Sequence, residues 1–151
     1  MTRFRWIALA VGGLVLVGAG WLLFGRSSQP QQQAIYSVSQ NYRVCLASTA
    51  AATPAWPALQ AAHGAINAQQ VTVPASAVGD QVPYLNGLLA LKCRLIVVAG
   101  ADLHDAATTV AKANPKQQFV TVGTPLNLPN VHDLPDASGL TRFVTDAAAH
   151  S

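Results

Sequence analysis

Seven residues of this chain could contact a small polar ligand together, because each lies at the end of a predicted strand or after one and offers a polar side chain, an indole or an unobstructed backbone. They are Ser48, Thr49, Trp56, Gly100, Asp102, His104 and Thr124. An indole can stack on a planar base, and a carboxylate can accept hydrogen bonds from sugar hydroxyls. The alternative is that the hydroxyls belong to ordinary loops, that Asp102 only caps a helix and that Trp56 packs locally.

Motifs for catalysis, phosphate binding and metal binding are missing from the sequence. It contains neither the Gly-x-Ser-x-Gly elbow of serine hydrolases nor a Gly-x-Gly-x-x-Gly or Walker loop for nucleotide phosphates. The run Asp102-Leu103-His104-Asp105 has no second cluster to complete a coordination shell, which favours a solvated helix start over a metal site. His63 lies on an apolar helical face and is expected to be packed, while His132 and His150 have no visible partner. We therefore expect no enzymatic activity, no metal and no cofactor.

The elements that would position the seven residues alternate between strands and helices. Strands are predicted over 41–48, 70–73, 95–99, 118–123 and 131–134. One helix is predicted after Pro54, and a second over 81–92 with Asp80 as its expected cap. Two further helices are predicted to follow the expected caps Asp102 and Ser138. This alternation predicts a doubly wound parallel α/β sheet with the flavodoxin-like strand order 2-1-3-4-5. Ligands bind such sheets beyond the carboxyl ends of the strands, here between the first and third strands.

The two cysteines, Cys45 and Cys93, are an even pair that an oxidising compartment would allow to form a disulfide. The first and third strands are neighbours in the expected order. However, Cys45 lies three residues before Ser48, whereas Cys93 lies seven before Gly100. This stagger argues against bridging distance, so a disulfide and two free thiols both remain open.

The N-terminal segment predicts a membrane attachment. Residues 6–24 form an uncharged, apolar run of the length that crosses a bilayer as a helix, with Arg3 and Arg5 before it. The positive-inside rule then places residues 1–5 in the cytoplasm, and residues 25–34 form a polar tether to an extracytoplasmic domain over 35–151. The alternative is a cleaved signal peptide, which would leave the domain secreted.

Charge restricts the partners of that domain. Three of the nine Lys and Arg residues lie in the first 26 residues, and the remaining six are balanced by six Asp residues. A neutral domain is not expected to carry a basic stripe for phosphates, so nucleic acid is not an expected partner.

Residues 84–100, from Tyr84 to Gly100, resemble the helix-strand passage of the basic membrane protein family. The similarity continues through residues 105–106, 111–115 and 118–122, includes Arg43-Val44-Cys45-Leu46, and covers about residues 41–124. These family members are nucleoside-binding lipoproteins of ABC importers with a type I periplasmic-binding fold. The resemblance implies that fold, a nucleoside-like ligand bound without catalysis, and an importer as partner.

This chain departs from the family at the ligand site. The segment 48–56 lacks the family's carboxylates and amide, Gly100 is followed by Ala101 rather than Phe, and Gly123 stands where the family has Asp. The length accounts for one lobe, and no lipidated cysteine is present. A single lobe should bind weakly unless a partner lobe or a second copy closes the cleft. The alternative function is a structural or regulatory protein-interaction module that has lost ligand binding.

Overall fold

The computed structural model describes residues 42–51 and 54–151. The predicted cytoplasmic segment 1–5, membrane segment 6–24 and tether 25–34 therefore lie outside the described residues. Within the described ranges, no helix combines the length and the apolar character needed to cross a membrane.

A five-stranded parallel sheet forms the centre of the domain. Its strands are β1 (Arg43–Ser48), β2 (Asn67–Thr72), β3 (Leu95–Ala99), β4 (Gln118–Val122) and β5 (Val131–Leu134). Their order is β2-β1-β3-β4-β5, which confirms the predicted topology. All five residues of β3 are buried, as expected for a continuous apolar run at the centre of a sheet covered on both faces.

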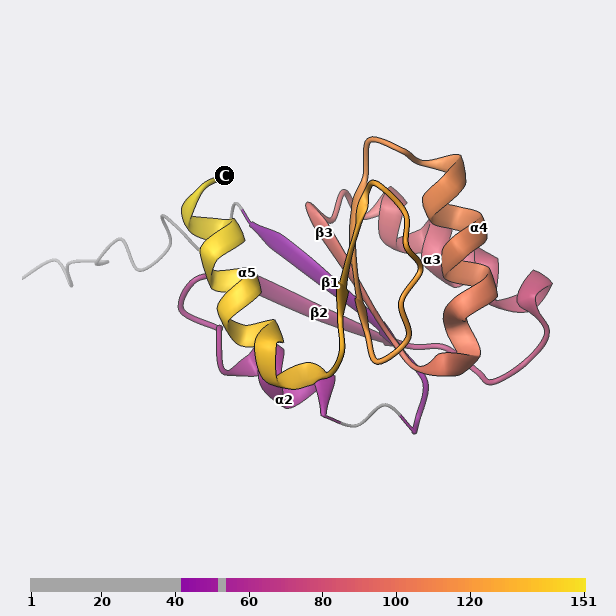
Figure 1. Ribbon diagram of the computed structural model, residues 1–151, viewed down its shortest axis with the longest axis horizontal. Coiled ribbons are helices and arrows are strands. Elements are labelled where there is room, and N and C mark those ends of the chain that lie inside the picture. The colour runs from indigo at the N-terminus through magenta and orange to yellow at the C-terminus, as the bar shows by residue number, and fades with distance from the viewer. Residues whose placement is uncertain (1–41, 52–53) are drawn as a thin grey trace, which may run out of the picture. The chain divides into compact units, whose positions relative to one another are not determined.

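Two helices cover each face of the sheet (Figure 1). Helices α2 (Ala55–Gln60) and α5 (Leu140–Ala149) pack on one face, and α3 (Val78–Ala90) and α4 (His104–Ala113) pack on the other. Two short 3₁₀ turns, η1 (Ala101–Leu103) and η2 (Ala137–Gly139), precede α4 and α5. Each face of the sheet has its own apolar core. Successive residues along each strand therefore pack against opposite faces.

The connection from β4 to β5 has no helix. The Asp133 carboxylate holds it instead, accepting hydrogen bonds from the Thr121 hydroxyl at 2.5 Å and from the backbone N–H groups of Leu126 and Asn127 at 3.0 and 2.9 Å. Burial opposes ionisation of Asp133, but these hydrogen bonds outweigh it and hold the pKa of the carboxyl below its usual range. The loop is thereby fixed over the α3/α4 face, where Leu126 and Leu128 pack against the core.

Several local predictions, on the first helix and on the helix caps, were wrong. The first helix ends at Gln60, because the chain turns over residues 61–65 to reach β2, and this leaves His63 exposed instead of packed. Asp80 lies in the first turn of α3 and makes no side-chain cap, since α3 begins earlier than expected. Asp102 lies in η1 without a capping hydrogen bond, and Asp136 rather than Ser138 caps the last helical segment.

A disulfide joins Cys45 and Cys93, whose Cα atoms are 5.8 Å apart. The register of β1 and β3 explains how the two cysteines meet although they lie at different distances from the ends of their strands. Cys45 lies beside Ile96 in the sheet, and the backbone N–H of Arg94 donates to the carbonyl of Arg43 at 2.8 Å. The segment before β3 therefore runs alongside β1, which brings Cys93 within bridging distance of Cys45.

Candidate functional site

A cavity of about 270 Å³ opens at the carboxyl ends of the strands, on the face covered by α2 and α5. Its walls come from the ends of β3 and β4, the segment after β5 and the start of α2. The lining residues are Pro54, Ala55, Ala99, Gly100, Val122, Gly123, Pro135, Asp136 and Ala137. The cavity thus lies at the carboxyl edge, where open α/β folds bind ligands, but beside β3 and β4 rather than between the first and third strands as predicted.

Gly100 lines this cavity, and a side chain at its position would be strained. Its φ is +124°, a backbone conformation that suits only glycine, and an added Cβ would come within 2.7 Å of the Thr49 hydroxyl oxygen. Thr49 is only 5% exposed, and its hydroxyl has no hydrogen-bond partner within residues 42–51 and 54–151. An unpaired buried hydroxyl therefore lies against the residue that lines the cavity, with hydrogen-bonding capacity unused.

The Ser48 hydroxyl is already occupied. It is 1% exposed and accepts a hydrogen bond from the Gln70 side-chain amide at 3.0 Å, which ties the end of β1 to β2. Its position beside Ala99 in the sheet places Ser48 under the cavity as a structural support.

The other predicted residues lie away from the cavity wall. Trp56 is half-buried on α2 and packs against the core between the sheet and the α2/α5 layer. Asp102 is exposed in η1, and the His104 imidazole pairs with the neighbouring Asp105 carboxylate at 3.0 Å. Thr124 follows β4 and does not line the cavity. Among the residues described, no three metal-ligating side chains are grouped closely enough to hold a metal ion.

Sequence reasoning missed Asp136, whose carboxylate is the charged group of the cavity wall. Its Oδ1 accepts a hydrogen bond from the Ser138 backbone N–H at 2.7 Å, and the hydrogen bonds from Ser138 hold the pKa of Asp136 below its usual range. Asp136 is therefore ionised at neutral pH. The signal was a carboxylate two residues after the fifth predicted strand, at the edge where ligands bind.

The charges of the domain separate between the two ends of the sheet. We define the acidic edge as the carboxyl end, where Asp80, Asp102, Asp105, Asp133 and Asp136 lie. We define the basic edge as the amino end, where Arg43, Lys92, Arg94, Lys112 and Lys116 lie.

This separation corrects the prediction that the domain has no basic stripe, because a net charge of zero does not report where the charges are. In the part of the chain that the structure describes, Arg142 at the start of α5 is the one Lys or Arg outside the basic edge, and it pairs with Asp146 at 3.7 Å. The excess of carboxylates at the acidic edge favours neutral or cationic ligands over phosphates.

Comparisons with known proteins support the fold. No family model matches the chain, and no curated protein does either. Among solved structures, a putative lipoprotein from Peptoclostridium difficile 630 (fragment) aligns with a TM-score of 0.57 and 20% identity, covering 71% of this chain and 98% of that one. A solute-binding protein of an ABC transporter system from Aeropyrum pernix K1 aligns with a TM-score of 0.48 and 14% identity, covering 60% of this chain and 27% of that one. The chain thus shares an α/β fold with the first of these proteins, and its resemblance to the basic membrane protein family stays a prediction.

Proposed function

We propose that this protein is a membrane-anchored, extracytoplasmic and non-catalytic binding protein whose α/β lobe presents half of a site for a neutral, nucleoside-like ligand. The observation that carries the proposal is the carboxyl-edge cavity, whose wall includes the ionised Asp136. An Asp carboxylate can accept hydrogen bonds from ribose hydroxyls, and the apolar remainder of the wall suits the flat face of a base.

The membrane attachment rests on the sequence of residues 6–24, which we propose to insert into lipid with the N-terminus in the cytoplasm. A solved protein of the same fold, from Peptoclostridium difficile 630, is described as a putative lipoprotein, which supports a location at a membrane. The disulfide between Cys45 and Cys93 agrees with an oxidising compartment.

The cavity needs a second surface to enclose a ligand. About 270 Å³ at an open edge is slightly below the usual range of enclosed small-molecule sites. We propose that a second-lobe protein, or a component of an ABC importer, supplies the other half.

A protein-interaction module without a ligand is the second candidate. The observation in its favour is the composition of the wall: apart from Asp136, every lining residue is apolar or glycine. The Ser48 hydroxyl beneath it is also already paired with Gln70. An apolar hollow at a sheet edge can accept a side chain of a partner protein as readily as a base.

Thermal unfolding of the full chain in non-ionic detergent micelles, with and without a nucleoside panel, tests the proposal. One nucleoside class should raise the midpoint, because a ligand at a hundred times its Kd stabilises the native state by about 2.7 kcal/mol. The matching 5′-monophosphates should not, since the acidic edge repels them.

Variants locate the effect. Ala137→Leu fills the cavity and should abolish the shift, whereas Ala149→Leu, at the exposed end of α5, should retain it. Asp136→Asn keeps an acceptor for the Ser138 N–H but removes the charge, and should weaken nucleoside binding. A cooperative transition that no nucleoside shifts would reject ligand binding and favour the interaction module.

A further inference from the structure

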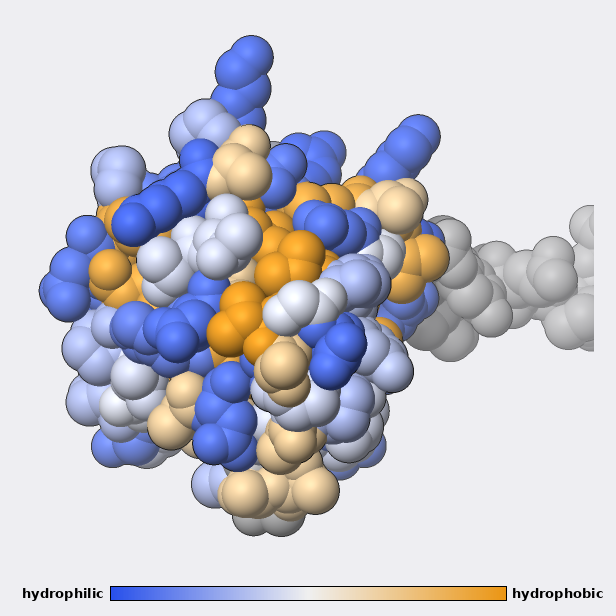
Figure 2. Space-filling view, turned by 90° about the vertical axis from the view of Figure 1, so that its right-hand side faces the viewer, coloured by the Kyte–Doolittle hydropathy of each residue, from blue (hydrophilic) through white to orange (hydrophobic). Residues whose placement is uncertain are grey.

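The basic edge collects five of the six cations that follow residue 26. Arg43 opens β1, Lys92 and Arg94 precede β3, and Lys112 and Lys116 lie at the end of α4 and in the turn before β4. Because β1, β3 and β4 are adjacent and neighbouring strands are about 4.8 Å apart, the cations beside these strands form a row across them, and Lys112 lies on the covering helix α4. Figure 2, which faces the α3/α4 layer, shows hydrophilic side chains projecting from this edge at the top of the view.

The cations of this row have no acidic partner. Within residues 42–51 and 54–151, the ion pairs are His104 with Asp105 and Arg142 with Asp146, neither of which involves the row. The first 41 residues contain no Asp or Glu. Arg43 and Arg94 are also hydrogen-bonded neighbours through their backbones at 2.8 Å. Like charges held side by side repel each other, and an anionic surface would relieve that repulsion.

A rigid frame holds the row in place. The Arg43 guanidinium donates to the carbonyl of Leu91 at 2.6 Å. The Gln117 side-chain amide donates to the carbonyls of Cys93 and Arg94, each at 3.1 Å, and the disulfide fixes Cys93 to β1. Binding therefore requires little ordering of the backbone, which lowers the entropic cost of association.

Helix dipoles explain only part of the charge separation. Lys112 lies in the last turn of α4, where a cation is favoured by the helix carbonyls. Lys92 directly follows Leu91, the C-cap of α3, and the Arg43 guanidinium donates to the Leu91 carbonyl, so these two cations also lie at a helix carboxyl end. Arg94 and Lys116 lie beyond the helix caps and need another explanation.

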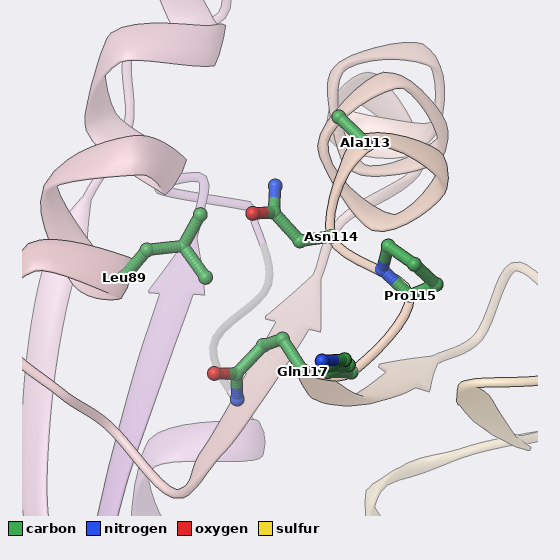
Figure 3. Close-up of a pocket in the computed structure, with 6 residues that line it drawn as sticks. Leu89, Ala113, Asn114, Pro115 and Gln117 are labelled. Atoms are coloured by element: carbon green, nitrogen blue, oxygen red, sulfur yellow. The ribbon is translucent and has the colours of Figure 1, made fainter.

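The same edge is hollowed and partly apolar. A cavity of about 440 Å³ is lined by Leu89 and residues 113–117, including Lys116. Figure 3 shows Leu89 approaching this cavity from α3, and Asn114, Pro115 and Gln117 bordering it from the turn after α4. Leu91, next to Lys92, is 44% exposed. Apolar side chains among lysines suit the boundary between lipid headgroups and acyl chains.

We propose that the basic edge docks on anionic lipid headgroups of the membrane that holds residues 6–24, an inference that rests on the membrane attachment proposed above. Because β1 begins at Arg43, the preceding 42 residues lead into the domain at this edge. Residues 25–41 reach at most about 60 Å when fully extended, which keeps the basic edge near the bilayer. Docking through the basic edge leaves the acidic edge and its cavity facing away from the lipid.

Lysine acylation in nanodiscs tests this proposal, because Lys92, Lys112 and Lys116 are the three lysines of the chain and all lie on the basic edge. The full chain is incorporated into zwitterionic phosphatidylcholine discs and into discs containing phosphatidylglycerol, and the acylation rate at each lysine is measured by mass spectrometry. Anionic discs should lower the three rates about fivefold or more at low salt. Adding 0.5 M salt, which shortens the Debye length to about 4 Å, should restore them.

An internal control comes from the opposite end of the sheet. Ser76 is exposed in the loop between β2 and α3, at the acidic edge. The lysine that Ser76→Lys introduces there should react equally in both discs.

Charge variants and soluble anions complete the test. Lys112→Gln combined with Lys116→Gln should reduce the protection of Lys92, whereas Arg142→Gln, a cation on α5 that pairs with Asp146, should not. Equal rates in the two discs, or equal protection of the lysine at the acidic edge, would overturn the docking while leaving the ligand half-site standing. Protection in zwitterionic discs by inorganic phosphate or a short DNA duplex would also overturn it, by showing a soluble-anion or nucleic-acid site. Failure of the chain to enter either disc would overturn both the docking and the proposed membrane attachment.

Discussion

Replacing Gly100 by alanine tests the central geometry of the carboxyl-edge cavity. Gly100 has φ +124° and ψ 128°, a region that costs an L residue about 1–3 kcal/mol. The new Cβ would also lie 2.7 Å from the Thr49 hydroxyl oxygen, so the buried Thr49 side chain must leave its rotamer at about 0.5–1.5 kcal/mol. We therefore expect Gly100→Ala to lower the free energy of unfolding by about 2–4 kcal/mol.

Urea-induced unfolding of the full chain in non-ionic micelles, followed by circular dichroism, measures this loss. Gly87→Ala is the matched control, because Gly87 lies inside α3 with no atom within 4 Å of the added Cβ. The same chemical change should there raise the free energy of unfolding by about 0.5–1 kcal/mol.

A double variant separates the two costs of Gly100→Ala. Thr49→Ala removes the hydroxyl that the new Cβ would meet, so it should recover about 1 kcal/mol and leave the backbone strain in place. Full recovery of the unfolding free energy in the double variant would refute the assignment of most of the loss to backbone strain at Gly100. A Gly100→Ala protein as stable as Gly87→Ala would refute the geometry of the wall itself.

Two further predictions concern the groups that fix the frame. The lowered pKa of Asp133 means that its ionised form stabilises the fold above the unfolded-state pKa of about 3.9, and that this contribution is lost as pH falls through the folded-state pKa. Thermal midpoints should therefore fall less steeply between about pH 5 and pH 2 in Asp133→Asn than in the parent, and parallel curves would contradict this. Reducing the disulfide, which spans 48 residues, should cost about 4 kcal/mol of unfolding free energy in urea denaturation, and Cys45→Ala should be insensitive to the reductant.

The strand order was predictable from the sequence because it follows from few physical constraints. A continuous apolar run over 95–99 requires cover on both faces, and right-handed crossovers leave few ways to arrange five parallel strands. Helix boundaries were less predictable. The apolar positions Ala62 and Ile66 are buried as the helical pattern indicated, but they lie in a turn, since the chain must return to β2 by Asn67.

The site was only partly predictable, because its wall is built from segments that carry no motif. Gly100 was found from its place after a strand, whereas Pro135, Asp136 and Ala137 belong to a turn after the short strand β5. Thr49 was found for its hydroxyl, but its unpaired state depends on packing against Gly100 that no local pattern encodes. The net charge does not reveal the two charged edges, because they depend on the end of the sheet at which each charged residue lies.

The charges of the acidic edge also bear on the second surface that the half-site needs. In a symmetric pair formed through the carboxyl edge, each copy would present Asp102, Asp105 and Asp136 to the same residues of the other. Such a homodimer brings like charges together, and Arg142 is already paired with Asp146. A different protein with Lys or Arg on its docking face would be attracted by the same carboxylates. The carboxylates of the acidic edge therefore favour a hetero-complex with a basic partner over a homodimer.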